Sequence, residues 1–214
     1  QGRILYDVGC DYRKIHDPVL RERWYGGFSM DPPQMTEEQR LPAHFARLGL
    51  TPADIDLVFL GHLHFDHCGG LCEVCGAEVH VQADELAAAR AQADDAYFLD
   101  DFAGDYRWKI QTGEYDLVPG VRAIATPGHT AGHMSLLIEL PEGRPVILAG
   151  DAADLQENLD QEIAPGTLWQ DREDMAIDSI RKLKALAGET GGQLWPNHDM
   201  AFYQSLKRFP EYHA

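Results

Sequence analysis

Three histidines and an aspartate fall within six residues of this chain, and this run limits what the chain can fold into more than any other feature. The run His62-Leu63-His64-Phe65-Asp66-His67 directly follows an apolar stretch, 56–61, that ends in glycine. Such a stretch is typical of a buried strand. Alternate residues of an extended chain face the same way, so His62 and His64 can converge on one ion, while Asp66 and His67 turn towards a second point. Because the whole chain holds only ten histidines, chance is a poor explanation for this run.

Three later residues extend this pattern, because each comes just after a predicted strand. His129 lies in a turn rich in Gly and Pro, Asp151 follows the strand predicted over 145–149, and His198 follows the strand predicted over 193–195. We therefore expect all of these side chains at one rim of the predicted sheets. The ligand sets that result are His62, His64 and His129 for one ion, Asp66, His67 and His198 for another, and Asp151 as a bridge.

The composition of these sets indicates a catalytic metal site. Three protein ligands with one open position are typical of catalytic zinc, whereas a structural zinc site is closed. Two ions about 3.5–4 Å apart can share a hydroxide. Imidazole and carboxylate ligands without thiolate fit Zn²⁺, with Mn²⁺, Fe²⁺ or Co²⁺ as substitutes. The sequence therefore predicts two divalent metal ions, Zn²⁺ first among them.

The charge of the chain excludes several classes of partner. The 214 residues carry 18 Lys+Arg against 35 Asp+Glu, a formal net charge of −17. A chain this acidic lacks the basic surface that binds phosphate backbones or anionic membranes. With no apolar run near the ~20 residues that a membrane span needs, we expect no nucleic acid and no membrane as partner.

Strand-like and helix-like runs alternate along the chain, which predicts a layered α/β sandwich in a single domain, 1–214. Residues 11–35 are predicted to be a long irregular segment. Because the chain starts at Gln1 without an initiator Met and its first strand follows at once, we expect an N-terminal segment to be missing. The predicted strands are 3–8, 56–61, 78–82, 106–111, 121–126, 134–140, 145–149 and 193–195, and the predicted helices are 36–48, 84–94, 171–187 and 200–207.

The metal motif and its flanks resemble the metallo-β-lactamase superfamily, and within it the N-acyl-homoserine lactonases. The likeness covers nearly the whole chain, including Ile4–Gly9, the stretch from Leu63 to Gly70, the stretch from Pro127 to His133, and the closing Phe209-Pro210-Glu211-Tyr212. The resemblance implies a metallo-β-lactamase-type αβ/βα four-layer sandwich. It also implies that a metal-bridging hydroxide attacks the lactone carbonyl, and that Asp66 helps to deliver a proton to the leaving alkoxide.

One position departs from this family's pattern. Such lactonases place a Tyr three residues after the bridging Asp, where it can hydrogen-bond the lactone carbonyl, but Asp154 stands there in this chain. An ionised Asp154 cannot donate that bond. Either Asp154 is protonated, or another group such as Tyr203 or Tyr97 serves, or the substrate binds differently. Asp154 is accordingly a second candidate catalytic residue beside Asp66.

Residues around the ligands have candidate supporting roles. Phe65, Trp24, Tyr25 and Phe28 are candidates for an apolar substrate pocket, with residues 11–35 as a lid over it. His133 and Asp199 are candidates for orienting the metal ligands by hydrogen bonds. For each of these the alternative is an ordinary role in the core, in a hydrogen bond or in a helix cap.

Other functions stay open at this point. A lactonase acting on another ring such as 4-pyridoxolactone, or another ester hydrolase of the superfamily, would use the same ligands. A different class is a non-catalytic or redox protein that uses Cys68, Cys72 and Cys75, although free thiols in a reducing compartment explain these residues better. We expect a cytoplasmic, quorum-quenching lactonase with a small-molecule lactone as substrate, acting as a monomer or homodimer.

Overall fold

The computed structural model describes residues 2–209 and 211–214, which divide into two compact units. The first unit comprises the chain up to Val81 together with Leu86–Gln111, and the second comprises Gln82–Glu85 and Thr112–Ala214. Each unit contains one β-sheet with its own helices. Pro210 of the closing motif lies outside the described residues, and the single-domain organisation stays a prediction.

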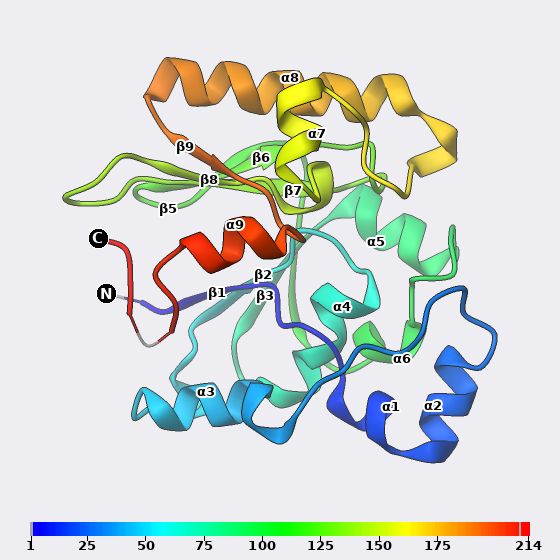
Figure 1. The fold of residues 1–214 in the computed structure, drawn as a ribbon. Coiled ribbons are helices and arrows are strands. Elements are labelled where there is room, and N and C mark those ends of the chain that lie inside the picture. Colours follow the sequence, from blue (N-terminus) through cyan, green and yellow to red (C-terminus); the bar gives the residue numbers. More distant parts are fainter. Residues whose placement is uncertain (1, 210) are drawn as a thin grey trace. The chain divides into compact units, whose positions relative to one another are not determined.

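The sheet of the first unit has the strand order β1-β2-β3-β4 (Figure 1). These strands are β1 (Ile4–Tyr6), β2 (Leu57–Phe59), β3 (Glu78–Gln82) and β4 (Arg107–Gln111). The pairs β1–β2 and β2–β3 are parallel, with Leu5 opposite Val58 and Val58 opposite Val79. Val58 and Val79 are buried in the core of this unit. Parallel strands are usually covered on both faces, which explains why β2 lies within an unbroken apolar run.

Short helices make up most of the rest of the first unit. They are α1 (Tyr12–His16), α2 (Pro18–Tyr25), α3 (Leu41–Arg47), α4 (Phe65–Cys68) and α6 (Leu99–Phe102), with 3₁₀ turns at Glu37–Gln39, Pro52–Asp54 and Gly69–Glu73. Helix α5 (Ala83–Arg90) begins in the segment that belongs to the second unit.

The prediction that residues 11–35 are irregular is wrong, because α1 and α2 occupy half of this segment. Asp11 caps α1 by accepting a hydrogen bond from the Arg13 amide, and Asp17 caps α2 by accepting from the amides of Val19 and Leu20. Pro18 stands at the first position of α2, where its missing N–H costs nothing. Aspartates at N-cap positions thus start two short helices in a stretch with little helical periodicity. Residues 26–36 contain no helix or strand, and the lid role stays a prediction for this shorter segment.

The helix predicted over 36–48 is divided in two. The Thr36-x-x-Gln39 pattern forms a capping box around a 3₁₀ turn, and the Thr36 amide donates to Gln39 Oε1 over 2.7 Å. Pro42 then lies in the first turn of α3. Arg40 is extended, with a ψ of 149°, and Pro42 has no N–H to bond back into the preceding turn, so the 3₁₀ turn ends and a new helix starts at Leu41.

The second unit is built on a five-stranded sheet of order β5-β6-β7-β8-β9. Its strands are β5 (Tyr115–Val118), β6 (Val121–Ala125), β7 (Met134–Ile138), β8 (Val146–Leu148) and β9 (Gln193–Trp195), and its helices are α7 (Gln156–Gln161), α8 (Glu173–Thr190) and α9 (Met200–Ser205), with 3₁₀ turns at Gly150–Ala152 and Trp169–Asp171. The sequence predicted β9 with the same bounds and did not predict β5. In Figure 1, α8 runs along this sheet, with α7 beside it. The α8 residues Ile180 and Leu183 pack with Ile124 and Ile147 of the sheet in one apolar core.

The topology of this sheet brings three strand ends to one edge. Strands β6, β7 and β8 pair antiparallel in turn, so β6 and β8 run in the same direction, and β9 pairs parallel with β8. The carboxyl ends of β6, β8 and β9 therefore lie at the same edge. His129, Asp151 and His198 follow those three ends, as expected from the sequence.

Among the described residues, no helix combines the length and the apolar character that crossing a membrane requires.

Candidate metal centre

Three candidate ligands of the first unit lie together in the segment after β2. The side chains of His62, His64 and His67 are buried, and His62 has no exposed surface. The His62 ring centroid is 4.6 Å from that of His64 and 3.9 Å from that of His67. The extended residues 62–64 and the short helix α4 thus place His62 against both His64 and His67, whereas the spacing predicted this proximity for His64 alone.

Asp7 fixes the orientation of His67. The Asp7 carboxylate accepts a 2.7 Å hydrogen bond from His67 Nδ1 through Oδ2 and a 2.8 Å bond from the Gly61 amide through Oδ1. Asp7 has a φ of +51°, a left-handed conformation that is uncommon for a residue other than glycine. Strain of this kind persists where surrounding contacts hold it, and here it aims the carboxylate at both groups.

Asp94 plays the same part for His64. Asp94 Oδ2 accepts from His64 Nε2 over 3.1 Å, while Oδ1 accepts from the Ala96 amide over 2.9 Å. The Ala96 carbonyl in turn accepts from the Phe65 amide. Carboxylates that orient metal-binding histidines in this way fix the tautomer, so Nδ1 of His64 and Nε2 of His67 carry the lone pairs.

A contact within this half of the site fits a bound cation. With its Nδ1 proton directed to Asp7, a neutral His67 presents the lone pair of Nε2 to Asp66 Oδ2, 3.6 Å away. Two electron-rich atoms at this distance repel each other unless a cation or a proton lies between them. Asp66 and His67 therefore suit a divalent metal ion as shared ligands.

In the second unit, Asp151 is the residue on which the other ligands converge. Its Oδ2 lies 3.4 Å from His129 Nε2 and 3.2 Å from His198 Nε2. Its Oδ1 accepts a 2.7 Å hydrogen bond from Asn197 Nδ2. Asp151 and His129 are buried, whereas the His198 side chain is 45% exposed. The three residues that follow β6, β8 and β9 thus meet, as the sequence predicted.

His129 repeats the lone-pair arrangement of His67. The Thr167 carbonyl accepts a 3.1 Å hydrogen bond from His129 Nδ1, and the Trp169 amide donates to the Gly128 carbonyl over 2.7 Å. A neutral His129 therefore presents an Nε2 lone pair to the Asp151 carboxylate. A cation beside both atoms removes this repulsion, so these residues of the second unit also suit a metal.

His133 positions Asp151 through the backbone. The Asp151 amide donates to His133 Nε2 over 2.9 Å, so this nitrogen carries a lone pair and the ring proton is on Nδ1. Nδ1 lies 2.8 Å from Thr126 Oγ1 and 3.2 Å from the Thr126 carbonyl. These contacts agree with the supporting role for His133, which stays a prediction.

Asp154 and Asp199 lie on the same side of the second unit as His198. Asp154 is partly buried, and its backbone carbonyl accepts a 2.8 Å hydrogen bond from the His198 amide. Asp199 is the N-cap of α9, where Oδ1 accepts from the Phe202 amide, and Oδ2 accepts from the Gln156 amide. Asp199 therefore starts the helix that follows His198, as the helix-cap alternative expected, and its support of the ligand stays a prediction.

The aromatic residues predicted to line a substrate pocket divide into two groups. Trp24 and Phe28 line a hollow of about 370 Å³ in the first unit, together with Asp94, Tyr97 and Phe98. Tyr25 and Phe65 are buried in an aromatic cluster with Phe98, and the Phe65 and Phe98 rings stack at 4.8 Å. The pocket role stays a prediction for all four, with Trp24 and Phe28 placed where a ligand can reach them.

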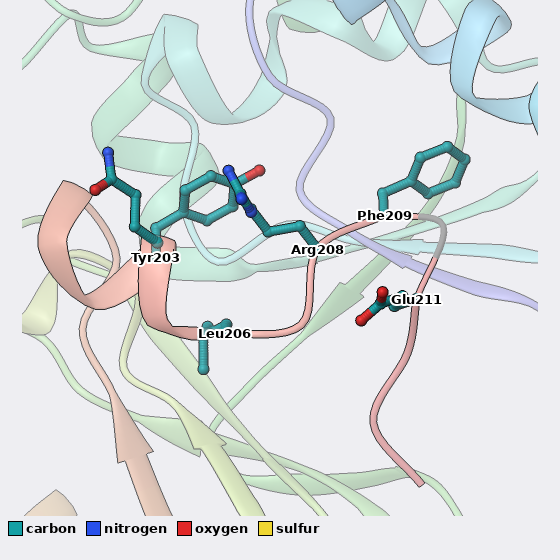
Figure 2. Close-up of a pocket in the computed structure, with 6 residues that line it drawn as sticks. Tyr203, Leu206, Arg208, Phe209 and Glu211 are labelled. Atoms are coloured by element: carbon teal, nitrogen blue, oxygen red, sulfur yellow. The ribbon is translucent and has the colours of Figure 1, made fainter.

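The two tyrosines considered as substitutes for a carbonyl-binding group have different surroundings. Tyr97 is buried, and its ring centroid lies 4.7 Å from that of His64. Tyr203 is 53% exposed and lines a second hollow of about 520 Å³ with Leu206, Arg208 and Glu211. Figure 2 shows the Tyr203 and Arg208 side chains extending to one side of this segment and Leu206 to the other.

The cysteines are all free thiols in the structure. Cys68 is buried, whereas Cys72 and Cys75 are exposed. Burial raises the pKa of Cys68 well above that of an ordinary thiol and the pKa of Cys10 to about 12. Partial desolvation of its thiol raises the pKa of Cys72 to about 11. Because the thiolate is the reactive form, this environment does not favour the redox alternative.

The sequence did not point to Asp7, Asp94 or Thr167, although each contacts a candidate ligand. The position of Asp7 could have indicated a functional role, because a charged residue stands at the end of a strand-like run in the stretch Ile4–Gly9. The positions of Asp94 and Thr167 gave no such indication, since their contacts depend on the tertiary structure.

Comparison with known proteins agrees with this arrangement. Residues 2–190 match the metallo-beta-lactamase superfamily. The chain is 34% identical to an N-acyl homoserine lactonase of a Bacillus species and 30% identical to one of Azorhizobium caulinodans, over 99% and 100% of this chain and 82% and 83% of those proteins. A solved N-acyl homoserine lactone hydrolase, with N-hexanoyl-L-homoserine bound at its catalytic metal centre, superposes with a TM-score of 0.87 at 32% identity. This superposition covers 99% of this chain and 82% of that one.

These similarities extend over nearly the full chain and include the candidate ligands of each unit. The fold is therefore the metallo-β-lactamase fold expected from the motif, and the predicted resemblance is confirmed. The chain belongs to the metallo-β-lactamase superfamily and, within it, to the family of N-acyl homoserine lactonases.

Proposed function

We propose that this protein is a metal-dependent hydrolase that opens the lactone ring of N-acyl homoserine lactones. The observation that carries the proposal is the similarity, over nearly the full chain, to lactonases of that name, one of them solved with the ring-opened product at its metal centre. The sets of metal-binding side chains in the two units are the independent support for this similarity.

Seven residues would hold two divalent metal ions in this proposal. The first unit supplies His62, His64, Asp66 and His67, and the second supplies His129, Asp151 and His198. Histidine nitrogens and carboxylate oxygens in this ratio suit Zn²⁺, with Mn²⁺, Fe²⁺ and Co²⁺ as alternatives. When bound, such ions polarise a carbonyl and lower the pKa of water enough for it to act as a nucleophile at neutral pH.

The residues of the chain have separate tasks in the reaction. A water molecule adds to the lactone carbonyl carbon, and the bond from this carbon to the ring oxygen breaks. The products are an alcohol, a carboxylate and one proton released to solvent. Asp66, which is partly exposed beside His67, would pass the proton from the attacking water to the leaving ring oxygen. Asp7, Asp94 and the Thr167 carbonyl hold the histidine rings, so their lone pairs are oriented before substrate binds.

The two candidate substrates, N-acyl homoserine lactones and 4-pyridoxolactone, differ in that only the first carries an acyl chain. The hollow lined by Trp24 and Phe28 has both aromatic and polar walls, which suits an amide followed by a short apolar chain. Release of protons on ring opening should be measured side by side with N-hexanoyl homoserine lactone and 4-pyridoxolactone. We expect the first to be the better substrate by kcat/KM, and the opposite order would replace this proposal with the 4-pyridoxolactone alternative.

The biological setting follows from the substrate. Ring opening destroys an acyl-homoserine lactone signal, so we infer a quorum-quenching role, and the lactonases it resembles support this. A cytoplasmic location and a monomeric or homodimeric state belong to the same proposal. Light scattering during size-exclusion chromatography would distinguish a monomer from a dimer.

A further inference from the structure

The second unit holds a second potential metal-binding carboxylate, Asp154, close to Asp151 and His198. One ligand atom each from Asp151, Asp154 and His198 lie within 4.8 Å of one another. Asp151 and His198 belong to the seven ligands proposed above, whereas Asp154 occupies the position where the family pattern has a tyrosine. The cluster lies entirely in the second unit, so its geometry is that of one compact body.

The backbone fixes the distance between Asp154 and His198. Strands β8 and β9 continue past their ends as a hydrogen-bonded pair, with Ala149 donating to Trp195, Asn197 to Ala153, and finally His198 to the Asp154 carbonyl over 2.8 Å. Asp154 and His198 therefore stand opposite each other at the end of a paired segment. A flexible surface carboxylate would have no such fixed relation to a histidine.

The Asp154 carboxylate is also directed by its surroundings. Its Oδ1 atom is shielded from solvent, and its Oδ2 lies 3.5 Å from the Gly166 amide. Burial disfavours an ionised carboxylate, and a second carboxylate nearby disfavours it further. A divalent cation between Asp151 and Asp154 offsets both costs, because it is attracted to each carboxylate.

From this geometry, and resting on the metal-dependent function proposed above, we propose that Asp154 is a metal ligand on the His198 side of the centre. The site then has one more carboxylate than the seven-residue set, which favours cations that prefer oxygen ligands, such as Mn²⁺. An ionised Asp154 bound to metal cannot donate a hydrogen bond to the substrate. Another residue must then bind the lactone carbonyl.

Metal binding tests this proposal directly. Isothermal titration of the metal-free protein with Mn²⁺ and with Zn²⁺ should be compared for the wild type, Asp154→Asn and Asp116→Asn. Asp116 is an exposed carboxylate on β5, so its replacement controls for the loss of one negative charge. We expect Asp154→Asn to lower the affinity for one of the two ions at least 10-fold, with a larger loss for Mn²⁺ than for Zn²⁺. Asp116→Asn should change the affinity for neither ion by more than about twofold.

A second variant keeps the test decisive if the amide disturbs the fold. Asp154→Glu retains a carboxylate, so it must bind the affected ion more tightly than Asp154→Asn. Equal affinity of the wild type and Asp154→Asn for both metals would overturn the proposal, as would equal affinity of the two variants. These outcomes are separate from the lactonase proposal. A protein that binds two ions yet hydrolyses no lactone would refute the proposed function, whereas the metal affinities of the variants would still decide whether Asp154 is a ligand.

Discussion

Three candidate ligand histidines share one feature at the residue scale, which is that one ring nitrogen of each is bound to a fixed acceptor. Asp7 holds His67, Asp94 holds His64, and the Thr167 carbonyl holds His129. The ligands could be predicted from the sequence because their spacing and their places after strands are local. The acceptors could not, since Asp94 follows His64 by 30 residues and Thr167 follows His129 by 38.

Asp7 offers the sharpest test at this scale. Asp7→Asn removes the charge that strengthens the bond to His67, while asparagine tolerates the left-handed backbone at this position. We expect metal affinity to fall about 10- to 100-fold with little change in the stability of the metal-free protein. Titration calorimetry would measure the affinity, with Asp105→Asn, an exposed carboxylate of the same unit, as the control. An unchanged affinity would show that Asp7 does not orient His67 for a metal.

At the scale of elements, the extended strands were the easiest to predict and the capped helices the hardest. The runs at 78–82 and 193–195 became β3 and β9 without a shift, because apolar runs bounded by turn residues leave little choice. Helices α1 and α2 were missed because each depends on one capping aspartate and on packing within the first unit. Short helices gain most of their stability from such tertiary contacts, which are not visible in the sequence.

The turn that carries His129 depends on a glycine that has no room for a side chain. A Cβ on Gly132 would lie 2.3 Å from the Glu85 backbone nitrogen, whereas a Cβ on Gly188 of α8 would meet no atom within 4 Å. We expect Gly132→Ala to lower the free energy of unfolding by roughly 1–3 kcal/mol or more. Gly188→Ala should raise it by about 0.5–1 kcal/mol, since alanine is the better helix former. Urea unfolding of both variants measures the difference, and similar values for the two would contradict the predicted contact.

A buried ion pair joins α1 to α6 in the first unit. Lys14 Nζ lies 2.7 Å from Asp101 Oδ1, and both side chains are almost fully buried. Burial raises the pKa of Asp101 to about 6, a rise that the Lys14 ammonium opposes. The folded state therefore holds the Asp101 proton more tightly than the unfolded state, and this group costs stability as the pH rises from about 4 through 6.

Removal of Lys14 should increase the loss of stability that accompanies ionisation of Asp101. At pH 7.5 we expect Lys14→Met to lower the free energy of unfolding by about 3–5 kcal/mol, because an ionised Asp101 is left buried alone. The loss should be smaller at pH 5, where Asp101 is protonated, and the double variant Lys14→Met/Asp101→Leu should recover most of it. Denaturant unfolding at both pH values measures these energies. Equal losses at the two pH values would mean that Asp101 does not carry the charge.

For the whole molecule, the central claim is that two divalent ions make this acidic chain a lactonase. Two such ions change the formal charge from −17 to −13, and both are expected to bind among carboxylates and buried imidazoles. The family assignment could be predicted from the sequence because its motifs are spread over the full chain. The identity of the metal could not, since the same ligands suit several ions.

The most direct test of this claim is to titrate the chelator-treated protein with Zn²⁺ and follow hydrolysis of N-hexanoyl homoserine lactone by proton release. The account predicts no hydrolysis without metal, and a rate that reaches its plateau at about two ions per chain, as two-metal chemistry requires. Hydrolysis that survives complete removal of metal, or a plateau reached at one ion per chain, would contradict it.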